Sequence, residues 1–278
     1  MAERPRIGEQ MSSDLQLPTG IDPNKPSAAR IYDCFLGGSH NFAADRAVAA
    51  RAVELVPELP KIMKANRAFL HRAVRVAASR GIRQFLDLGS GIPTEGNVHE
   101  IARAVDPEVR VAYVDLEPTA VLHAREILGD DPRTVVLPGD LQRPEGFLED
   151  PRLRQLIDFD RPVCVLMIAV LHFVPESPLL SAALARYREV AAPGSALVLS
   201  HATGSARHGA LERVADLYNR TGTPLVLRDD AQVHDLFDGW DLVEPGIVFS
   251  PLWRPDPAQP PVDDPAAYIT LAGMGIKA

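Results

Sequence analysis

The sequence has little of the residue types and patterns that mark several large protein classes. Its 278 residues include two cysteines, Cys34 and Cys164, which form neither a disulfide framework nor a metal-binding spacing. This cysteine usage favours a reduced, cytoplasmic protein. The longest apolar run, residues 163–171, is about half of the roughly 20 residues that a membrane-spanning helix requires, so no membrane span is predicted. Charged residues interrupt the first nine positions, and no signal peptide is expected.

Positive charge is also in deficit. Lys and Arg number 29 and Asp and Glu number 37, which gives a formal net charge of −8. Proteins that bind the phosphate backbone of nucleic acids need a surplus of cations, so nucleic acid is disfavoured as a partner, although a local basic patch is not excluded. Aromatic residues make up 6% of the chain, and no aromatic cage stands out. The length suits one large α/β domain, or one domain with an elaboration, and is too short for a multidomain assembly.

The order of the patterns divides the chain into three parts. Residues 1–18 are mixed, charged and aperiodic, which is typical of a disordered leader. Residues 19–81 carry only helical patterns, so an N-terminal helical cap is predicted there. Residues 82–278 contain the strand patterns and are predicted to form the main domain. The helices of the cap are expected at 28–36, with Ser27 as N-cap, and at 43–55 and 60–80.

Short apolar strands alternate with helical patterns in the main domain. This alternation is typical of βαβ units, and it predicts a mostly parallel sheet with helices on both faces. Two further strands follow the parallel series and are expected to pair as a late hairpin. Strands are expected at 84–89, 109–114, 134–137, 162–167, 195–200, 240–244 and 268–274, and helices at 94–105, 118–129, 177–191 and 206–218.

A glycine-containing loop, Asp87-Leu88-Gly89-Ser90-Gly91-Ile92-Pro93-Thr94, follows the first predicted strand. In open α/β sheets, ligands bind at the carboxyl ends of the strands, and glycines there let the backbone approach the ligand closely. Asp115 ends the second strand and is placed to accept hydrogen bonds from ribose hydroxyls, with Glu117 as its rival for that role. Asp140 follows the third strand, where a carboxylate can accept a hydrogen bond from the adenine amine. This arrangement suits a nucleoside-containing ligand.

The details of the loop favour one kind of nucleoside. A dinucleotide-binding loop would have Gly or Ala at its sixth position, where this chain has Thr94, and the Gly-Lys-Ser/Thr of a mononucleotide phosphate loop is absent. Asp87 would repel a pyrophosphate but suits a cationic amine. S-adenosylmethionine carries an α-amino group and a sulfonium, so its charges fit Asp87, Asp115 and Asp140 better than those of NAD do.

These motifs resemble the first three motifs of class I S-adenosylmethionine-dependent methyltransferases, and the late strands are similar to the reversed seventh strand of that fold. More narrowly, residues 18–278 resemble an actinobacterial methyltransferase family formerly described as a domain of unknown function. The resemblance implies a Rossmann-like sheet with an antiparallel seventh strand, S-adenosylmethionine as cofactor, and methyl transfer. Pro93 stands where a third glycine is common in class I, but the narrower family has Pro-Thr there. The stretches that match are Ala29-Arg30-Ile31-Tyr32-Asp33, Leu36-Gly37-Gly38, Asn41-Phe42-Ala43-Ala44-Asp45, Asn66-Arg67-Ala68-Phe69-Leu70, Gln84-Phe85-Leu86-Asp87, Gly91-Ile92-Pro93-Thr94 and Val243-Glu244-Pro245-Gly246.

Polar residues in the cap concentrate around Gly37 and Gly38, which packing alone does not require. One hypothesis is that the cap closes over the amino-acid end of the cofactor; the alternative is a polar network that fixes the helices to the sheet. In the fold that the chain resembles, the segment after the fourth strand also faces that end of the cofactor. The cofactor contacts expected from all of these features are Asp87, Gly89, Ser90, Gly91, Asp115, Leu116, Asp140, Leu141, Ala169, Tyr32, Gly38 and Asn41.

His172 is the candidate catalytic residue, because the resemblance places its segment near the transferred methyl and an imidazole titrates near neutral pH. The alternative is that it only donates a hydrogen bond or packs beside Phe173. Methyl transfer depends mostly on alignment and desolvation, so a dedicated base is not required. No pair of histidines has a metal-ligand spacing, and no metal is predicted.

The function expected from the sequence is therefore S-adenosylmethionine-dependent methyl transfer to a small-molecule acceptor. The alternatives are a non-catalytic protein that binds S-adenosylmethionine or another nucleoside, and an NAD(P)-dependent oxidoreductase. Fold alone does not separate binding from catalysis, because function depends on the site. The sequence leaves the chemical class of the acceptor and the oligomeric state open.

Overall fold

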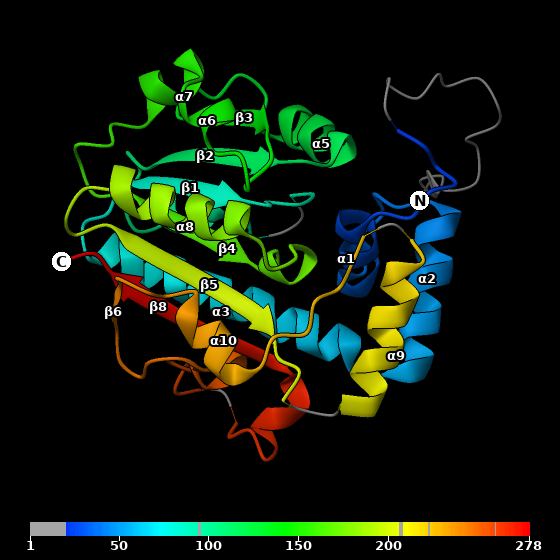
Figure 1. Ribbon diagram of the computed structural model, residues 1–278. Coiled ribbons are helices and arrows are strands. Elements are labelled where there is room, and N and C mark those ends of the chain that lie inside the picture. Colours follow the sequence, from blue (N-terminus) through cyan, green and yellow to red (C-terminus); the bar gives the residue numbers. More distant parts are fainter. Residues whose placement is uncertain (1–20, 94–95, 206–207, 222, 259) are drawn as a thin grey trace, which may run out of the picture.

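The computed structural model describes residues 21–93, 96–205, 208–221, 223–258 and 260–278. Their strands form one sheet in the order β3-β2-β1-β4-β5-β8-β6, with β7 also paired to β8 (Figure 1). Strands β1 to β5 run parallel, whereas β8 runs antiparallel to β5. The predicted fold class is confirmed. The strands are β1 (Gln84–Leu88), β2 (Arg110–Asp115), β3 (Thr134–Pro138), β4 (Cys164–Ile168), β5 (Ala196–Ala202), β6 (Asp241–Leu242), β7 (Val248–Phe249) and β8 (Thr270–Ile276).

Helices cover both faces of this sheet, and each face has its own apolar core. The alternate residues of the buried strands supply both cores, as expected for a sheet that is covered on both sides. Figure 1 shows α8 in front of the sheet and α3 behind it. On one face lie α3 (Leu59–Ser79), α4 (Val98–Arg103) and α5 (Pro118–Leu128), and on the other α6 (Glu145–Leu148), α7 (Pro151–Leu156), α8 (Pro178–Val190) and α10 (Asp230–Asp235).

A third apolar cluster lies beyond the carboxyl ends of the parallel strands. It joins α1 (Ala28–Leu36), α2 (Ala43–Leu55) and α9 (His208–Asn219), which stand together at one side of the molecule (Figure 1). The first two were predicted as parts of a cap. The third comes from the opposite half of the chain and follows β5. We call α1, α2 and α9 the cap from here on; the predicted division at residue 81 stays a prediction.

Local signals account for several helix ends. The hydroxyl of Ser27 accepts a hydrogen bond from the backbone N–H of Arg30 at the start of α1, and Gly37 ends that helix with a φ of 82°. The hydroxyl of Ser177 likewise accepts from the N–H of Leu180 at 3.1 Å at the start of α8. These ends agree with the sequence patterns.

Three predicted elements differ from the structure. The helix expected at 94–105 begins only at Val98, because Asn97 is its N-cap and the backbone N–H of Asn97 donates to Oε2 of Glu100 at 2.7 Å. Thr94 lies outside the described residues. The strand expected at 268–274 begins at Thr270, because a 3₁₀ helix (η3, Pro265–Tyr268) precedes it. The strand expected at 240–244 is limited to β6.

The leader expected at residues 1–18 lies outside the described residues. Among the residues that the structure does describe, none of the helices combines the length and the apolar character that crossing a bilayer would demand.

Candidate functional site

A cavity of about 380 Å³ opens at the carboxyl ends of β1 to β4, between the sheet and the cap. This is where the strand order reverses, with β2 on one side of β1 and β4 on the other. The loops after these four strands form its floor and one wall, α1 forms another wall, and Thr223 and Pro224 after α9 close one side. Its volume falls in the range of about 300–1,000 Å³ that small-molecule sites occupy.

The glycine loop after β1 is bent toward β2. Gly89 and Gly91 have φ values of 69° and 65°, a backbone region that other residues rarely adopt. The N–H of Gly89 donates to the carbonyl of Val114 at 2.8 Å, and the N–H of Gly91 donates to Oδ2 of Asp115 at 2.7 Å. A Cβ on Gly89 would lie 2.3 Å from Cγ2 of Val170, whereas a Cβ on Gly91 would meet nothing within 4 Å. Gly91 thus leaves its side of the loop open for a ligand.

Asp115 ends β2 at the floor of the cavity. Its Oδ1 accepts from the backbone N–H of Glu117 at 2.8 Å, and its Oδ2 accepts from Gly91. Burial raises the pKa of this carboxyl to about 6, although the two backbone N–H groups favour the ionised form. Each oxygen keeps further acceptor capacity, because a carboxylate has about four lone-pair sites. The orientation suits a pair of hydroxyl donors.

Asp87, near the end of β1, is the most strongly perturbed acid of the cavity. Burial raises its pKa to about 7; the guanidinium of Arg67 opposes that rise and the Asp115 carboxylate adds to it. Arg67 comes from α3 and lines the same cavity. A cation that binds beside this buried carboxyl would stabilise its ionised form, so the position favours a cationic ligand group.

The wall beside β2 and β3 combines one acid with two leucines. Asp140 lines the cavity, and its Oδ1 accepts from the N–H of Gln142 at 2.9 Å. Leu116 is 71% exposed and Leu141 is buried, and both line the cavity. The Leu116 side chain leaves a large apolar surface exposed, and a flat apolar ligand would gain free energy by covering it.

The opposite wall follows β4. Ala169 adopts a φ of 53°, which is rare for a residue with a side chain, and its N–H donates to the carbonyl and the hydroxyl of Ser200 at 3.1 and 3.0 Å. Val170 and Phe173 continue this wall. Across from them Tyr32 lines the cavity from α1, and its hydroxyl accepts from Nδ2 of Asn66 at 3.1 Å. This half of the cavity is more apolar than the half beside Asp115.

The structure brings most of the predicted site residues together. Of the predicted cofactor contacts, those that line the cavity are Asp87, Gly89, Ser90, Gly91, Asp115, Leu116, Asp140, Leu141, Ala169 and Tyr32.

Two of the predicted cofactor contacts, Gly38 and Asn41, lie outside the described lining of the cavity. Asn41 donates to Oδ2 of Asp33 at 2.8 Å and to the carbonyl of Gly38 at 3.0 Å, so it stabilises the turn after α1. Gly38 packs against Asp33 so closely that a Cβ would lie 1.9 Å from Oδ1. Neither Asn41 nor Gly38 lines the cavity, which agrees better with a network that fixes the cap than with direct contacts to a ligand.

His172 is buried behind the wall that follows β4. Its Nδ1 accepts from the N–H of Ala202 at 3.4 Å, and its ring lies against Phe173 and His201 with centroid distances of 4.4 and 5.5 Å. Burial and the neighbouring His201 and Arg228 lower its pKa well below the ordinary value. A proton-accepting role for His172 stays a prediction, and this geometry does not favour it.

Sequence reasoning missed three charged residues of the cavity wall. Arg67 and Asp33 were noted only within stretches that match the resembled family, and Glu117 only as a rival to Asp115; all three line the cavity. The stretches that contain Asp33 and Arg67 were noted in the sequence, but a spacing within helices does not tell which face of a helix meets the loops at the strand ends.

The polar lining of the cavity fits S-adenosylmethionine. Asp87 could pair with its ammonium, Asp115 could accept from its ribose hydroxyls, and Asp140 with the two leucines could hold its adenine. Arg67, the one guanidinium of the described lining, could pair with its carboxylate. The open side of Gly91 leaves room for the ligand at the bend between them. Among the described residues, no group of three or more His, Cys, Asp or Glu side chains is arranged to hold a metal ion.

Comparison with known proteins shows the family and the fold of the chain. The family model described as S-adenosyl methyltransferase matches residues 14–278. A protein from Thermobifida fusca YX, provisionally assigned as a methyltransferase, is 39% identical, with a TM-score of 0.87 over 95% of this chain and 99% of that one. A DUF574 family protein from Streptomyces avermitilis MA-4680 is 36% identical, with a TM-score of 0.88 over 92% of this chain and 99% of that one.

More distant structures share only the fold. An O-methyltransferase family protein from Burkholderia thailandensis is 15% identical, with a TM-score of 0.50 over 92% of this chain and 65% of that one. Among curated proteins, no sequence matches the chain.

Proposed function

The chain belongs to the S-adenosyl methyltransferase family, and on that premise we propose that it methylates a small-molecule acceptor that binds beside the cofactor in the cavity under the cap. The protein is an S-adenosylmethionine-dependent methyltransferase. The observation that carries the proposal is the two-part cavity: an acid-rich half beside β1 to β3 and a more apolar half between α1 and the segment after β4.

The cofactor is assigned to the acid-rich half. Asp115 would accept from the ribose hydroxyls, Asp140 from the adenine amine, and Asp87 from the ammonium, with Leu116 and Leu141 beside the adenine. Arg67 would pair with the carboxylate. When bound, the cofactor supplies a methyl group on a sulfonium, which is an electrophile for nitrogen, oxygen, sulfur or carbon nucleophiles.

The acceptor is assigned to the apolar half, where Leu36, Phe173, Val174 and Pro224 line the wall. These side chains exclude water from the reacting atoms and hold the acceptor in one orientation, which supplies most of the catalysis that such a transfer requires. The described lining shows no imidazole placed to take a proton. We therefore assign the chain an aligning and desolvating role.

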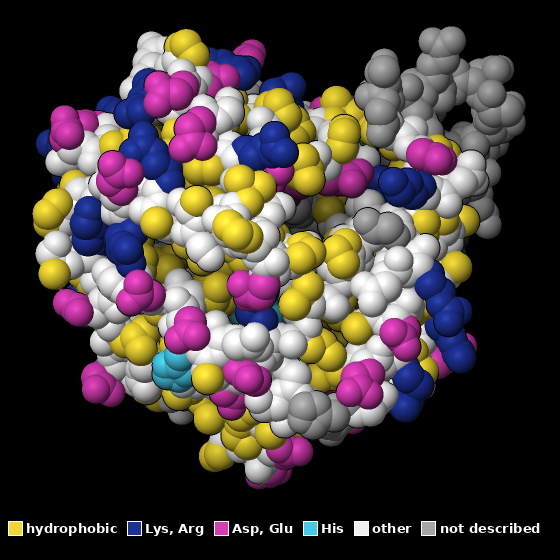
Figure 2. Space-filling view, viewed as in Figure 1, with side chains coloured by type: hydrophobic (Ala, Val, Ile, Leu, Met, Phe, Trp, Pro, Cys, Tyr) yellow, Lys and Arg dark blue, Asp and Glu magenta, His cyan; other side chains and the backbone are white. Residues whose placement is uncertain are grey.

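The charge of the lining favours a neutral or cationic acceptor over a phosphorylated or carboxylated one. Five carboxylates line the cavity, from Asp33, Asp87, Asp115, Glu117 and Asp140, and Arg67 is the guanidinium among the described lining residues. A cofactor with one net positive charge leaves this balance negative. A nucleic-acid acceptor is not supported either, because Asp and Glu outnumber Lys and Arg by 37 to 29, and acidic side chains lie among the basic ones over most of the face shown in Figure 2.

The first test is calorimetric titration of the protein with S-adenosylmethionine and S-adenosylhomocysteine, with NAD as the control ligand. We expect saturable binding of the first two and none of NAD. Asp115→Ala should weaken S-adenosylhomocysteine binding by about 100-fold or more, because two charge-assisted hydrogen bonds of roughly 1.5–3 kcal/mol each are lost. Asp160→Ala, which changes an exposed acid in another turn, should bind as the wild type does.

A screen of matched neutral, cationic and anionic acceptors with methyl-labelled cofactor then tests the acceptor class. Label transfer to neutral or cationic compounds supports the proposal. Transfer confined to phosphorylated or carboxylated compounds contradicts it, and binding of the cofactor without any transfer would favour a protein that only binds it.

A further inference from the structure

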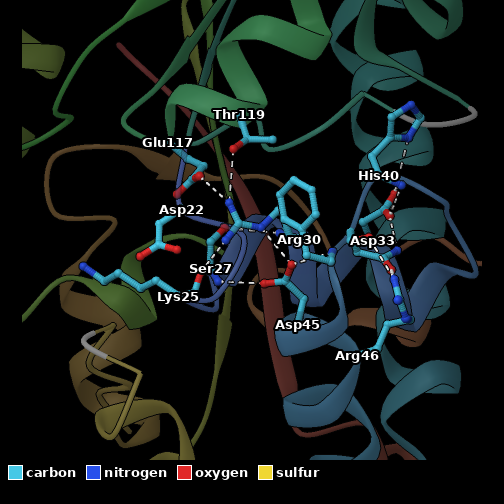
Figure 3. A network of polar contacts seen from close by, with 12 residues as sticks. Asp22, Lys25, Ser27, Arg30, Asp33, His40, Asp45, Arg46, Glu117 and Thr119 are labelled. Atoms are coloured by element: carbon cyan, nitrogen blue, oxygen red, sulfur yellow. Dashed lines mark hydrogen bonds and ion pairs between the residues drawn. The ribbon is translucent and has the colours of Figure 1, made fainter. Parts of the chain in front are cut away.

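A buried arginine of the cap contacts the segment that follows β2. Arg30 on α1 is 2% exposed and does not line the cavity. Figure 3 shows its guanidinium between α2 on one side and the segment after β2 on the other. Because an arginine presents five donors in a rigid fork, it can hold several acceptors at fixed angles to one another.

On the side of the cap, Arg30 is paired with a fully buried acid. Its Nε donates to Oδ2 of Asp45 at 2.8 Å, and Asp45 also accepts from the backbone N–H groups of Ser27 and Phe42 at 3.0 and 2.8 Å. The guanidinium lies over the ring of Phe42, 5.1 Å from its centroid. These contacts hold α1, α2 and the residues just before each helix together.

On the side of the sheet, the same guanidinium holds the segment that carries the ribose acid. Its Nη1 donates to Oε1 of Glu117 at 2.9 Å and to the hydroxyl of Thr119 at 3.1 Å. The backbone N–H of Glu117 in turn donates to Oδ1 of Asp115, and Oδ2 of Asp115 accepts from Gly91. A continuous series of contacts therefore runs from the cap through Arg30 to the glycine loop.

We propose that Arg30 is a positioning residue: by docking the cap onto Glu117 and Thr119 it holds Asp115 in the orientation that binds the cofactor. This inference rests on the proposed assignment of Asp115 to the ribose. Its consequence is that cofactor affinity depends on the contact between Arg30 and Glu117, and, because coupling between two sites is reciprocal, bound cofactor strengthens the docking of the cap.

The test is a double-mutant cycle on the affinity for S-adenosylhomocysteine, with Arg30→Lys, Glu117→Gln and both together. A lysine keeps the charge beside Asp45 but cannot bridge to Glu117 and Thr119 at once. We expect Arg30→Lys to weaken binding about tenfold, which is the loss of one charge-assisted hydrogen bond. The double variant should bind no more weakly than the weaker single variant, because both changes break the same link.

Arg72→Lys is the matched control. Arg72 is also a buried arginine that donates to backbone carbonyls, those of Ser250 and Trp253 at 2.7 and 2.8 Å, and it does not line the cavity. It should lower the stability of the protein and leave the affinity unchanged. A purely structural role for Arg30 would give the same result as this control.

Amide hydrogen exchange adds a readout that affinity does not give. In Arg30→Lys without ligand, the backbone amides of Leu116, Glu117 and Thr119 should exchange faster than in the wild type, whereas in Arg72→Lys they should not. If Arg30→Lys does not fold, Thr119→Val takes its place, since it removes one loop-side contact and keeps Asp45 paired; we then expect about threefold weaker binding.

An affinity of Arg30→Lys or of its substitute within error of the wild type, or strictly additive effects of Arg30→Lys and Glu117→Gln, would overturn the inference. These outcomes are distinct from failure of the proposed function, in which the wild-type protein itself would not bind S-adenosylhomocysteine.

Discussion

The carboxyl of Asp87 holds its proton more tightly in the folded protein than in the unfolded chain. Burial raises its pKa from an ordinary value of 3.8 to about 7. A raised folded-state pKa contributes stability that is fully present below the unfolded pKa and is lost as the pH rises through the folded pKa. The ligand-free protein therefore loses the contribution of Asp87 between about pH 4 and pH 7.

Cofactor binding at this residue should have the opposite pH dependence. The ammonium that we assign to Asp87 pairs with the ionised carboxylate, so binding below pH 7 must release a proton. We expect the affinity for S-adenosylmethionine to rise between pH 6 and pH 8, by at most about tenfold per pH unit below the pKa. Asp115, with a pKa of about 6, acts with the same sign at lower pH.

Titration calorimetry in two buffers of different ionisation enthalpy measures this proton directly. The number of protons released should fall toward zero as the pH passes 8. Asp87→Asn cannot ionise, so its affinity should be lower and nearly constant above pH 7. An affinity of the wild type that does not change between pH 6 and pH 8 would show that Asp87 does not meet a cation.

Adding one methyl group to each of the two glycines of the loop should lower the free energy of unfolding by different amounts. Gly91→Ala should lower the free energy of unfolding by about 1 kcal/mol, because it strains only the backbone at a positive φ. Gly89→Ala should cost about 3 kcal/mol, because its Cβ also meets Val170 at 2.3 Å. Urea denaturation measures both, and Val170→Ala in the Gly89→Ala background should recover part of the loss. Equal costs at the two glycines would contradict the contact with Val170.

The sequence alone indicated those site residues whose position follows from the end of a strand. Asp87, Asp115 and Asp140 each stand at the end of a strand, and parallel strands end at one edge of the sheet, so their meeting could be inferred without coordinates. Arg30 and Arg67 could not be placed in this way, because each acts through the face of a helix, and which face meets the sheet is decided by packing between distant segments.

The segment after β4 is held in place by a buried arginine that lies more than 50 residues later in the chain. Arg228 donates to the carbonyls of Leu171 and Val174 at 2.7 and 2.8 Å, and it pairs with Glu176. Burial and the charge of Arg228 lower the pKa of the adjacent His201 to about 4, so this imidazole is neutral near pH 7. The hydrogen bonds of Arg228 to the two carbonyls hold the 3₁₀ turn η1 (Leu171–Phe173) in place, and the last residue of this turn is part of the cavity wall.

Arg228→Met should therefore lower the free energy of unfolding by about 3–5 kcal/mol, because it leaves two carbonyls and a carboxylate without their donor. Arg186→Met on α8 is the control: Arg186 pairs with Glu189, whose side chain is 71% exposed, and its loss should cost about 0.5 kcal/mol or less. Denaturant unfolding of the two variants compares these costs. If the two variants are equally stable, the hydrogen bonds of Arg228 contribute little.

The elements that the sequence predicted well are those with both a periodic pattern and a local end signal. The predicted bounds of α2, 43–55, agree with Ala43–Leu55, and α5 begins at Pro118 as expected. The start of α4 was misplaced because Thr94 and Asn97 are both acceptable N-caps and only the tertiary structure selects between them. The joining of α9 to α1 and α2 could not be predicted, because an amphipathic helix does not specify its partner.

For the whole molecule, α3 decides whether the cap and the sheet behave as one body. Its first turns bury Leu59 and Ile62 in the cluster of the cap, and its later turns bury Phe69 and Val74 in the core on one face of the sheet. A single helix thus contributes to both clusters. Unfolding the cap alone would expose the first part of α3 and break the contacts of Arg30 with Glu117 and Thr119.

We therefore expect one cooperative thermal transition, which the cofactor product shifts as a whole. S-adenosylhomocysteine at 100 times its Kd should add about 2.7 kcal/mol of stability, which corresponds to a rise in Tm of about 5–10 °C for a chain of this size. Scanning calorimetry of the full chain with and without the ligand measures the shift, and Asp115→Ala should remove it. Two separate transitions, of which the ligand moves only one, would instead mean that the cap unfolds independently of the sheet, since a ligand stabilises only the unit whose folded state it binds.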